Sequence, residues 1–114
     1  MPGYVLDYLE LPSSNTARSR DFFGKAFGWT FVHFGDTYDE VHGAGLLAGI
    51  NGDAADRSEA PIPVIRTHDI EQAERDVVAA GGVITRKPYD YPGGRRFLFR
   101  EPGGAELAVY APKD

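Results

Sequence analysis

The stretch GGAELAVY, residues 103–110, matches the earlier stretch GAGLLAGI, residues 43–50, and this internal repeat decides the fold. A second pair of similar segments, AFGWTF at 26–31 and AGGVIT at 80–85, occurs in the same order. Self-similarity of this kind indicates that one structural unit is used twice in the chain. The sequence therefore predicts two copies of one module.

The first module begins with a predicted strand, YVLDYLELP, in which the residues of the two faces alternate. The segment TARSRDFFGKAFG has its apolar residues on one helical stripe, and Gly28 is placed to end the helix. Three short strands separated by glycine-containing turns follow: WTFVHF, TYDEVH and GLLAGI. We expect four aromatic residues of this module to lie in the core between helix and sheet: Phe22, Phe23, Phe27 and Trp29.

The same order returns after NGDAADRSEAP, whose small polar residues and final proline are typical of a linker. PIPVIRT is a predicted strand, and DIEQAERDVVAAGG is a predicted helix with Asp69 as N-cap and Gln72 as its capping-box partner. The last three predicted strands are VITRKP, RRFLFRE and AELAVYA. Each module is thus expected to have the order βαβββ.

A βαβββ module covers only one face of its sheet with its helix, so two modules side by side can enclose a cleft with their free faces. The predicted fold class is α+β, with two βαβββ modules forming a curved mixed sheet around a cleft and the helices on the outer face. We expect a single domain over residues 1–114, with module one at about 1–51, a linker at about 52–61 and module two at about 62–114.

Composition argues against several classes of function. The formal charge is −5 and the basic residues are scattered, which disfavours nucleic acid as a partner. No apolar run approaches the roughly 20 residues that span a membrane, and the start of the chain has no pattern of an export signal. The chain contains no cysteine for disulfides or thiolate metal sites. We therefore expect a cytoplasmic protein without membrane or nucleic-acid partners.

Several segments together resemble the vicinal oxygen chelate superfamily, which includes glyoxalases, bleomycin-resistance proteins and extradiol dioxygenases. The resemblance covers nearly the whole chain and implies paired βαβββ modules, usually in a homodimer. The segments that carry it are Asn15, the pair Phe22-Phe23, AFGW at 26–29, AAGG at 79–82 and REPGGAEL at 100–107.

In metal-using members of that superfamily, four side chains facing the cleft hold a divalent ion. The resemblance places these positions at Tyr8, Leu46, Ile62 and Glu106. Leucine and isoleucine offer no donor atom, and a divalent ion needs several oxygen or nitrogen ligands. We therefore expect no metal and no other cofactor, and lactoylglutathione lyase activity is not expected.

Strand alternation assigns a polar set to the cleft side of the sheet. The candidate ligand-binding residues are Tyr8, Glu10, His42, Arg66, Glu106 and Tyr110. Glu106 is the best candidate for a general base, although pairing with Arg66 or another basic residue is an equally good interpretation. For Glu10 a solvated position is favoured, and His33, His42 and His68 are each expected to be structural more often than functional.

The segment YDYPGGRR places Tyr89, Tyr91, Arg95 and Arg96 around a tight turn. These side chains suit a ligand rim or a subunit contact, while an ordinary exposed hairpin is the simpler interpretation. The leading hypothesis is a metal-independent protein that binds an aromatic or cationic small molecule and forms a homodimer. The alternatives are a lyase or isomerase that uses Glu106 as base, and an assembly subunit with a vestigial cleft.

Overall fold

A computed structural model describes residues 3–113 of the chain. The described residues form two compact units, one over residues 8–62 and the other over residues 3–7 and 63–113. They are called here the N-terminal and the C-terminal unit. The elements in chain order are β1 (Val5–Pro12), α1 (Thr16–Phe27), β2 (Thr30–Phe34), β3 (Tyr38–His42), β4 (Leu47–Asn51), β5 (Ile62–Arg66), α2 (Ile70–Ala79), β6 (Val83–Tyr91), β7 (Gly94–Arg100) and β8 (Glu106–Pro112).

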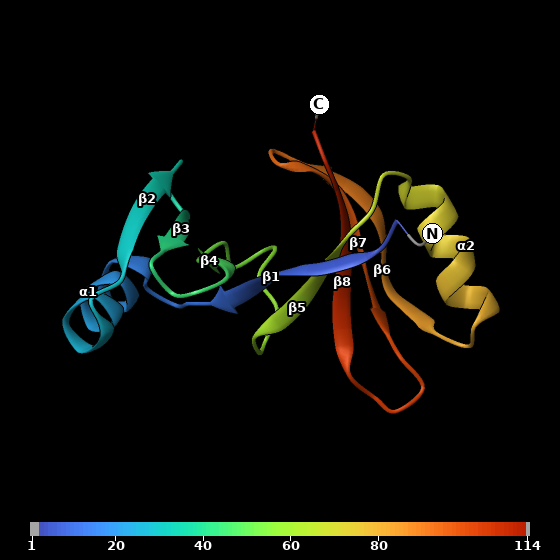
Figure 1. The fold of residues 1–114 in the computed structure, drawn as a ribbon, viewed down its shortest axis with the longest axis horizontal. Coiled ribbons are helices and arrows are strands. Elements are labelled where there is room, and N and C mark those ends of the chain that lie inside the picture. Colours follow the sequence, from blue (N-terminus) through green and yellow to red (C-terminus); the bar gives the residue numbers. More distant parts are fainter. Residues whose placement is uncertain (1–2, 114) are drawn as a thin grey trace. The chain divides into compact units, whose positions relative to one another are not determined.

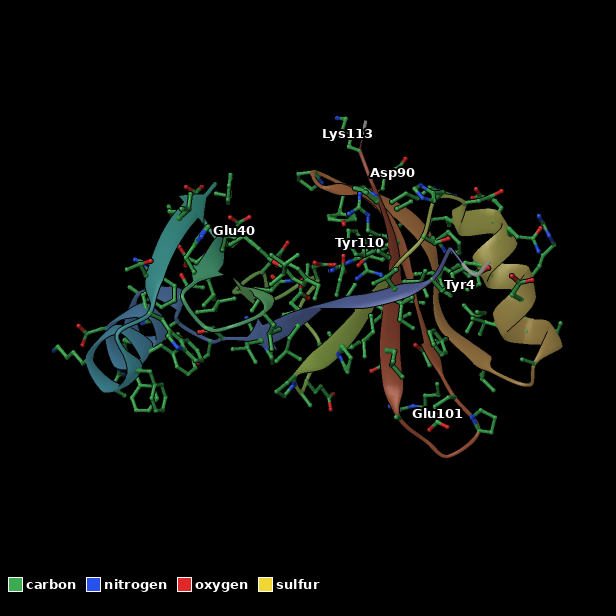
Figure 2. All side chains as sticks on the ribbon, viewed as in Figure 1. Tyr4, Glu40, Asp90, Glu101, Tyr110 and Lys113 are labelled. Atoms are coloured by element: carbon green, nitrogen blue, oxygen red, sulfur yellow. The ribbon has the colours of Figure 1, made fainter. Side chains whose placement is uncertain are left out.

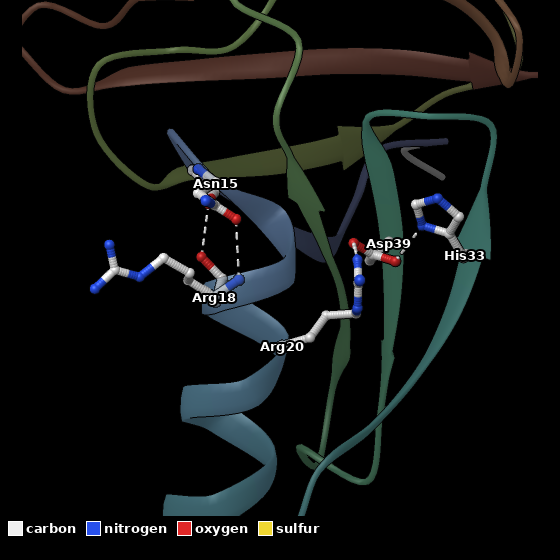
Figure 3. A network of polar contacts seen from close by, with 7 residues as sticks. Asn15, Arg18, Arg20, His33 and Asp39 are labelled. Carbon is white, nitrogen blue, oxygen red and sulfur yellow. Dashed lines mark hydrogen bonds and ion pairs between the residues drawn. The ribbon is translucent and has the colours of Figure 1, made fainter.

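The N-terminal unit has its strands in the order β2-β3-β4-β1, with β1 parallel to β4 and the other pairs antiparallel. Its core is formed by Val41, Ala48 and Ile50, against which Phe23 of α1 packs. Asn15 caps α1, because its side chain accepts a hydrogen bond from the Arg18 backbone N–H at 3.1 Å (Figure 3). The helix ends at Gly28, whose φ of 75° favours glycine, as the sequence predicts.

Two of the four aromatic residues expected in this core lie at the surface. Phe22 is 58% exposed and Phe27 is 61% exposed, so the prediction that they are core residues was wrong. Phe23 and Trp29 pack against the core cluster, and their rings stack with centroids 5.1 Å apart. Phe22 and Phe27 lie at the outer part of the aromatic group, where their rings contact Phe23 and Trp29.

The C-terminal unit has its strands in the order β5-β8-β7-β6, with β5 parallel to β8 and the other two pairs antiparallel. The helix α2 lies along one face of these strands (Figure 1), and the core between them is formed by Ile70, Ala73, Phe97, Phe99 and Val109. The apolar residues at helical spacing in α2 thus meet the alternate residues of β7 and β8.

The N-cap of α2 is Asp69, whose carboxylate accepts a hydrogen bond from the Gln72 backbone N–H at 3.1 Å, as predicted. The Gln72 side chain, however, bonds to Asp76 at 2.8 Å and to Arg75 at 2.9 Å. These residues lie further along the helix, so Gln72 does not serve as the expected capping-box partner.

The predicted βαβββ order, used twice, is confirmed, and so is the α+β fold class. The observed strand that differs most in length from its prediction is β6. It was predicted to end at Pro88 but continues to Tyr91, with two register shifts against β7. In the part of the chain that the structure describes, no helix has the length and apolar character required to cross a membrane.

Candidate functional site

Each sheet has one face packed against its helix and one face turned away from it, which we call the helix-free face. In β8, Leu107 and Val109 pack toward α2, so alternation places Glu106 and Tyr110 on the helix-free face. In β1, Leu9 packs toward the core of the N-terminal unit, which places Tyr8 on the opposite side. The sequence-based assignment of these residues to faces is therefore confirmed.

A row of directly opposed residues crosses the helix-free face of the C-terminal unit. The strand registers pair Arg66 of β5 with Tyr110 of β8, Tyr110 with Arg96 of β7, and Arg96 with Tyr89 of β6. Guanidinium and phenol groups thus alternate over all four strands, and we call these residues the Arg–Tyr row. Opposed residues in a sheet have their Cβ atoms about 5 Å apart, so neighbouring members of the row can contact one another.

Arg96 is the most deeply buried member of the row, with 6% of its surface exposed. Its Nε donates a hydrogen bond to the hydroxyl of Tyr89, and its guanidinium carbon lies 4.9 Å from the centre of the Tyr91 ring. Arg86 lies over the Tyr89 ring at 3.6 Å. Cation–π contacts of this kind hold planar groups in fixed positions, so the cluster is preorganised.

Arg95, which the sequence places in the same cluster, points the other way. Its guanidinium bonds to Glu71 of α2 at 3.1 Å and to Asp90 at 3.2 Å. These two ion pairs raise the pKa of Arg95, with the hydrogen bond to Glu71 as the largest cause. Strand alternation separates Arg95 from Arg96, so only the second belongs to the helix-free face.

Tyr110 contacts a residue that the sequence did not identify as a site residue. Its hydroxyl donates to the carboxylate of Asp7, with distances of 3.2 and 3.4 Å to the two oxygens. Burial raises the pKa of the Tyr110 phenol, and the charge and hydrogen bond of Asp7 raise it further, while Arg66 opposes them. The phenol therefore stays protonated and can donate a hydrogen bond. Figure 2 labels Tyr110 on β8.

Glu106 begins β8 and has two partners on the same sheet. Its Oε2 accepts a hydrogen bond from the Thr85 hydroxyl at 2.7 Å, and its Oε1 lies 4.0 Å from Nη2 of Arg100, the residue directly opposite on β7. The side chain is 28% exposed. The basic residue beside Glu106 is thus Arg100 rather than Arg66, which lies opposite Tyr110.

The helix-free face of the N-terminal unit is acidic and phenolic. Glu10 of β1 and Glu40 of β3 both lie opposite Gly49 of β4. The hydroxyls of Tyr8 and Tyr38 hydrogen-bond to each other directly above Gly49, in space that a Cβ atom at this position would occupy. Gly49 is therefore required by this close approach, and Tyr38 is a candidate site residue that the sequence did not indicate.

Glu10 is buried, with 4% of its surface exposed, so the prediction of a solvated side chain was wrong. The prediction relied on the position of Glu10 near the end of the strand; β1 does end at Pro12, as predicted, but the side chain is covered there. The amide of Asn51 donates to Glu10 at 3.3 Å and to Asp56 at 2.9 Å. Asn51 is itself 2% exposed, which makes it a second residue that the sequence did not single out.

The three histidines occupy different surroundings. His42 is half exposed and bonds to Glu40 at 2.7 Å on the helix-free face. His33 bonds through Nδ1 to Asp39 at 2.7 Å, and Asp39 also accepts from Arg20 of α1 at 2.8 Å (Figure 3). Asp39 is fully buried on the helix side of the sheet, so this network joins α1 to β2 and β3. His68 is exposed and precedes α2.

The residues present do not fit the divalent ion that metal-using relatives hold. Of the four equivalent positions, Leu46 is 56% exposed and Ile62 is 3% exposed, and neither has a donor atom. Tyr8 and Glu106 remain, which is too few for a stable site. Within residues 3–113, no three side chains of the histidine, cysteine, aspartate or glutamate type are grouped as a metal site requires.

Comparison with solved structures identifies the fold. A chain described as NAD-dependent benzaldehyde dehydrogenase from Legionella pneumophila is similar with a TM-score of 0.78 and 15% identity, over 93% of this chain and 98% of that chain. Methylmalonyl-CoA epimerase from Mycobacterium tuberculosis is similar with a TM-score of 0.70 and 12% identity, over 96% of this chain and 88% of that chain. At these identities the likeness concerns the fold alone.

A third structure, a glyoxalase/bleomycin resistance protein/dioxygenase superfamily member from Vibrio splendidus, is similar with a TM-score of 0.65 and 16% identity, over 93% of this chain and 97% of that chain. No curated protein matches the sequence. The family profile of the Glyoxalase/Bleomycin resistance protein/Dioxygenase superfamily matches residues 5–109, which include both modules. The chain therefore belongs to the Glyoxalase/Bleomycin resistance protein/Dioxygenase superfamily.

Proposed function

We propose that this protein binds a small planar organic molecule on the helix-free face of the C-terminal unit, without a metal ion. The observation that carries the proposal is the Arg–Tyr row, in which Arg66, Tyr110, Arg96 and Tyr89 alternate across four strands. A sheet face that served only as core would carry aliphatic side chains. Phenols and guanidinium groups instead offer flat surfaces for stacking and hydrogen-bond donors for polar substituents.

The burial of a charged side chain supports the same proposal. Arg96, in the middle of the Arg–Tyr row, is 6% exposed. Buried ionisable groups are frequent at binding and catalytic sites.

The test is a thermal-shift and calorimetric screen of aromatic compounds that carry cationic, neutral or anionic groups, each with and without EDTA. Arg66→Gln should weaken binding of a hit about five-fold or more, as expected for loss of one exposed charged contact. The matched control is Arg75→Gln on α2, outside the helix-free face, which should leave the affinity unchanged. Equal affinities of wild type and Arg66→Gln, or binding that requires metal, would overturn the proposal.

A second pair of variants tests the role of Glu106 in binding, with Glu71 as the matched control. Both Glu106 and Glu71 pair with an arginine of β7, but Glu71 lies on α2. Glu106→Gln should weaken ligand binding and leave the fold intact, whereas Glu71→Gln should have no effect on binding. The alternative activity, a lyase or isomerase with Glu106 as general base, predicts instead that deuterium from solvent enters substrate next to a carbonyl and that Glu106→Gln abolishes this exchange.

We also propose that two copies of the chain form a homodimer. The exposed rings of Phe22 and Phe27 on α1 supply apolar surface of the kind that marks protein contacts. Light scattering of the purified protein tests the assembly, and Phe22→Ser should shift it toward a monomer. A wild-type mass of one chain at all concentrations would refute it.

A further inference from the structure

A pocket of about 260 Å³ lies on the other side of the C-terminal sheet, between α2 and the strands. It is separate from the Arg–Tyr row, because α2 covers this face. Its floor is formed by the apolar side chains of Ile65, Phe99 and Val109. On the side of α2 the pocket is lined by Ala73, Val77 and Ala80.

The rim of the pocket is polar and acidic. Tyr4, from the N-terminal segment of the same unit, lies beside α2, and its hydroxyl donates a hydrogen bond to Asp76 (Figure 2). Glu101 lies at another part of the rim, in the loop between β7 and β8 (Figure 2), and accepts hydrogen bonds from the backbone N–H groups of Gly103 at 2.7 Å and Ala105 at 2.8 Å.

Both rim carboxylates are held in the ionised form. The hydrogen bond from Tyr4 lowers the pKa of Asp76, and the backbone hydrogen bonds from Ala105 and Gly103 lower the pKa of Glu101. The charge of Arg75, the preceding residue on α2, also lowers the pKa of Asp76, and the Arg75 guanidinium donates a hydrogen bond to Gln72. The lining of the pocket therefore combines an apolar interior with two fixed negative charges and no lining cation among the described residues.

From this combination we propose that the pocket binds a small apolar amine, with its hydrocarbon part on Ile65 and Val77 and its ammonium group at the rim beside Asp76. The size is suitable, since an apolar cavity of about 150 Å³ is enough to bind benzene. The pocket, at about 260 Å³, is larger than this, so it can hold an amine that consists of one aromatic ring and a short alkyl chain. Tyr4 competes with the ammonium group for Asp76, so its phenol controls access to the charge.

Three probes with the same apolar part test the proposal: 2-phenylethylamine, 2-phenylethanol and 3-phenylpropanoate. We expect binding in the order amine, alcohol, carboxylate, measured by NMR titration of the wild-type chain, with the largest shifts in the methyl signals of Ala73 and Val77. Equal binding of the three probes, or shifts confined to other residues such as those of the Arg–Tyr row, would overturn the assignment.

Two variants change the amine affinity in opposite directions. Asp76→Asn should weaken binding about five-fold, because it removes a charge at the rim without changing its shape. Tyr4→Phe should strengthen binding, because the carboxylate of Asp76 then loses one of its two competing donors and keeps only the bond from Gln72. Glu74→Gln, on α2 but outside the pocket lining, is the matched control and should leave the affinity unchanged. A higher affinity of Tyr4→Phe for the amine could not result from a loss of stability alone. If Asp76→Asn and Tyr4→Phe both bind the amine as wild type does, the proposal is refuted.

Discussion

The buried carboxylate of Asp39 gives a sharp stability prediction for the N-terminal unit. Asp39 is fully buried and accepts one hydrogen bond from Arg20 at 2.8 Å and one from His33 at 2.7 Å. Asp39→Ala removes both contacts and leaves the guanidinium of Arg20, which is 32% exposed, without its counterion. The carboxylate joins α1 to two strands, so its loss should loosen the attachment of the helix.

The expected magnitude follows from the two contacts. A hydrogen bond to a charged group contributes about 1.5 to 3 kcal/mol, and the lower end applies here because Arg20 and His33 can both reach water. Their sum is about 3 kcal/mol, within the range of roughly 3–5 kcal/mol measured for breaking buried pairs. At about 4 °C per kcal/mol for a chain of this length, the melting temperature should fall by about 12 °C.

The assay is urea unfolding followed by circular dichroism, with thermal unfolding as a second measurement. The matched control is Asp21→Ala on α1, because Asp21 forms an exposed ion pair with Lys25 at 3.1 Å. That pair should contribute less than about 0.5 kcal/mol. If Asp39→Ala and Asp21→Ala lower the free energy of unfolding by the same small amount, the structural role assigned to the buried carboxylate is refuted.

Two further predictions concern tyrosines. The hydrogen bond to Asp76 raises the pKa of Tyr4 from 10.0 to about 12. The contribution of this hydrogen bond to the free energy of unfolding is therefore complete below pH 10 and disappears as the pH rises from 10 to 12. Wild type should therefore be more stable than Tyr4→Phe at pH 8 and should lose that advantage by about pH 12, as measured by urea unfolding at each pH; an advantage independent of pH would contradict the assignment. Gly49→Ala should destabilise the chain by about 1–3 kcal/mol, because the new methyl group displaces the paired hydroxyls of Tyr8 and Tyr38. Gly24→Ala in α1 is the control: the new Cβ would meet only Trp29 and Phe31 at ordinary contact distances, so this variant should be neutral or stabilising. A Gly49→Ala variant as stable as wild type would show that the tyrosine pair does not lie above Gly49.

The sequence predicted the fold well because the same local signals occur twice. Asn15 and Asp69 cap the two helices, Gly28 ends the first of them, and alternation correctly assigned the faces of β1, β5 and β8. These features depend on residues close together in the chain. Local chemistry is sufficient to place them.

The candidate site was predicted only in part, because it depends on strand register. Arg66 and Tyr110 were each assigned to the correct face, but nothing local indicates that Arg96 and Tyr89 continue the same row. The contact between Tyr8 and Tyr38 depends on the close approach at Gly49, which only the paired strands reveal. A glycine in the middle of a predicted strand was the available signal for such an approach.

The exposed aromatic residues of α1 show a different limit. Helical periodicity places Phe22 and Phe27 on an apolar stripe, but it does not say how much of that stripe the sheet covers. Phe23 and Trp29 occupy the covered part. The width of the contact between a helix and a short-stranded sheet is a tertiary property that the pattern does not contain.

Metal analysis of freshly purified, tag-free protein tests most directly whether the helix-free face binds its ligand without a metal. Wild type and Glu106→Gln should be measured side by side by elemental mass spectrometry, without chelator during purification. We predict well below one equivalent of nickel, zinc, manganese or iron per chain in both proteins, because Leu46 and Ile62 replace two of the four ligands. Close to one equivalent in wild type that is lost in Glu106→Gln would contradict metal-independent binding.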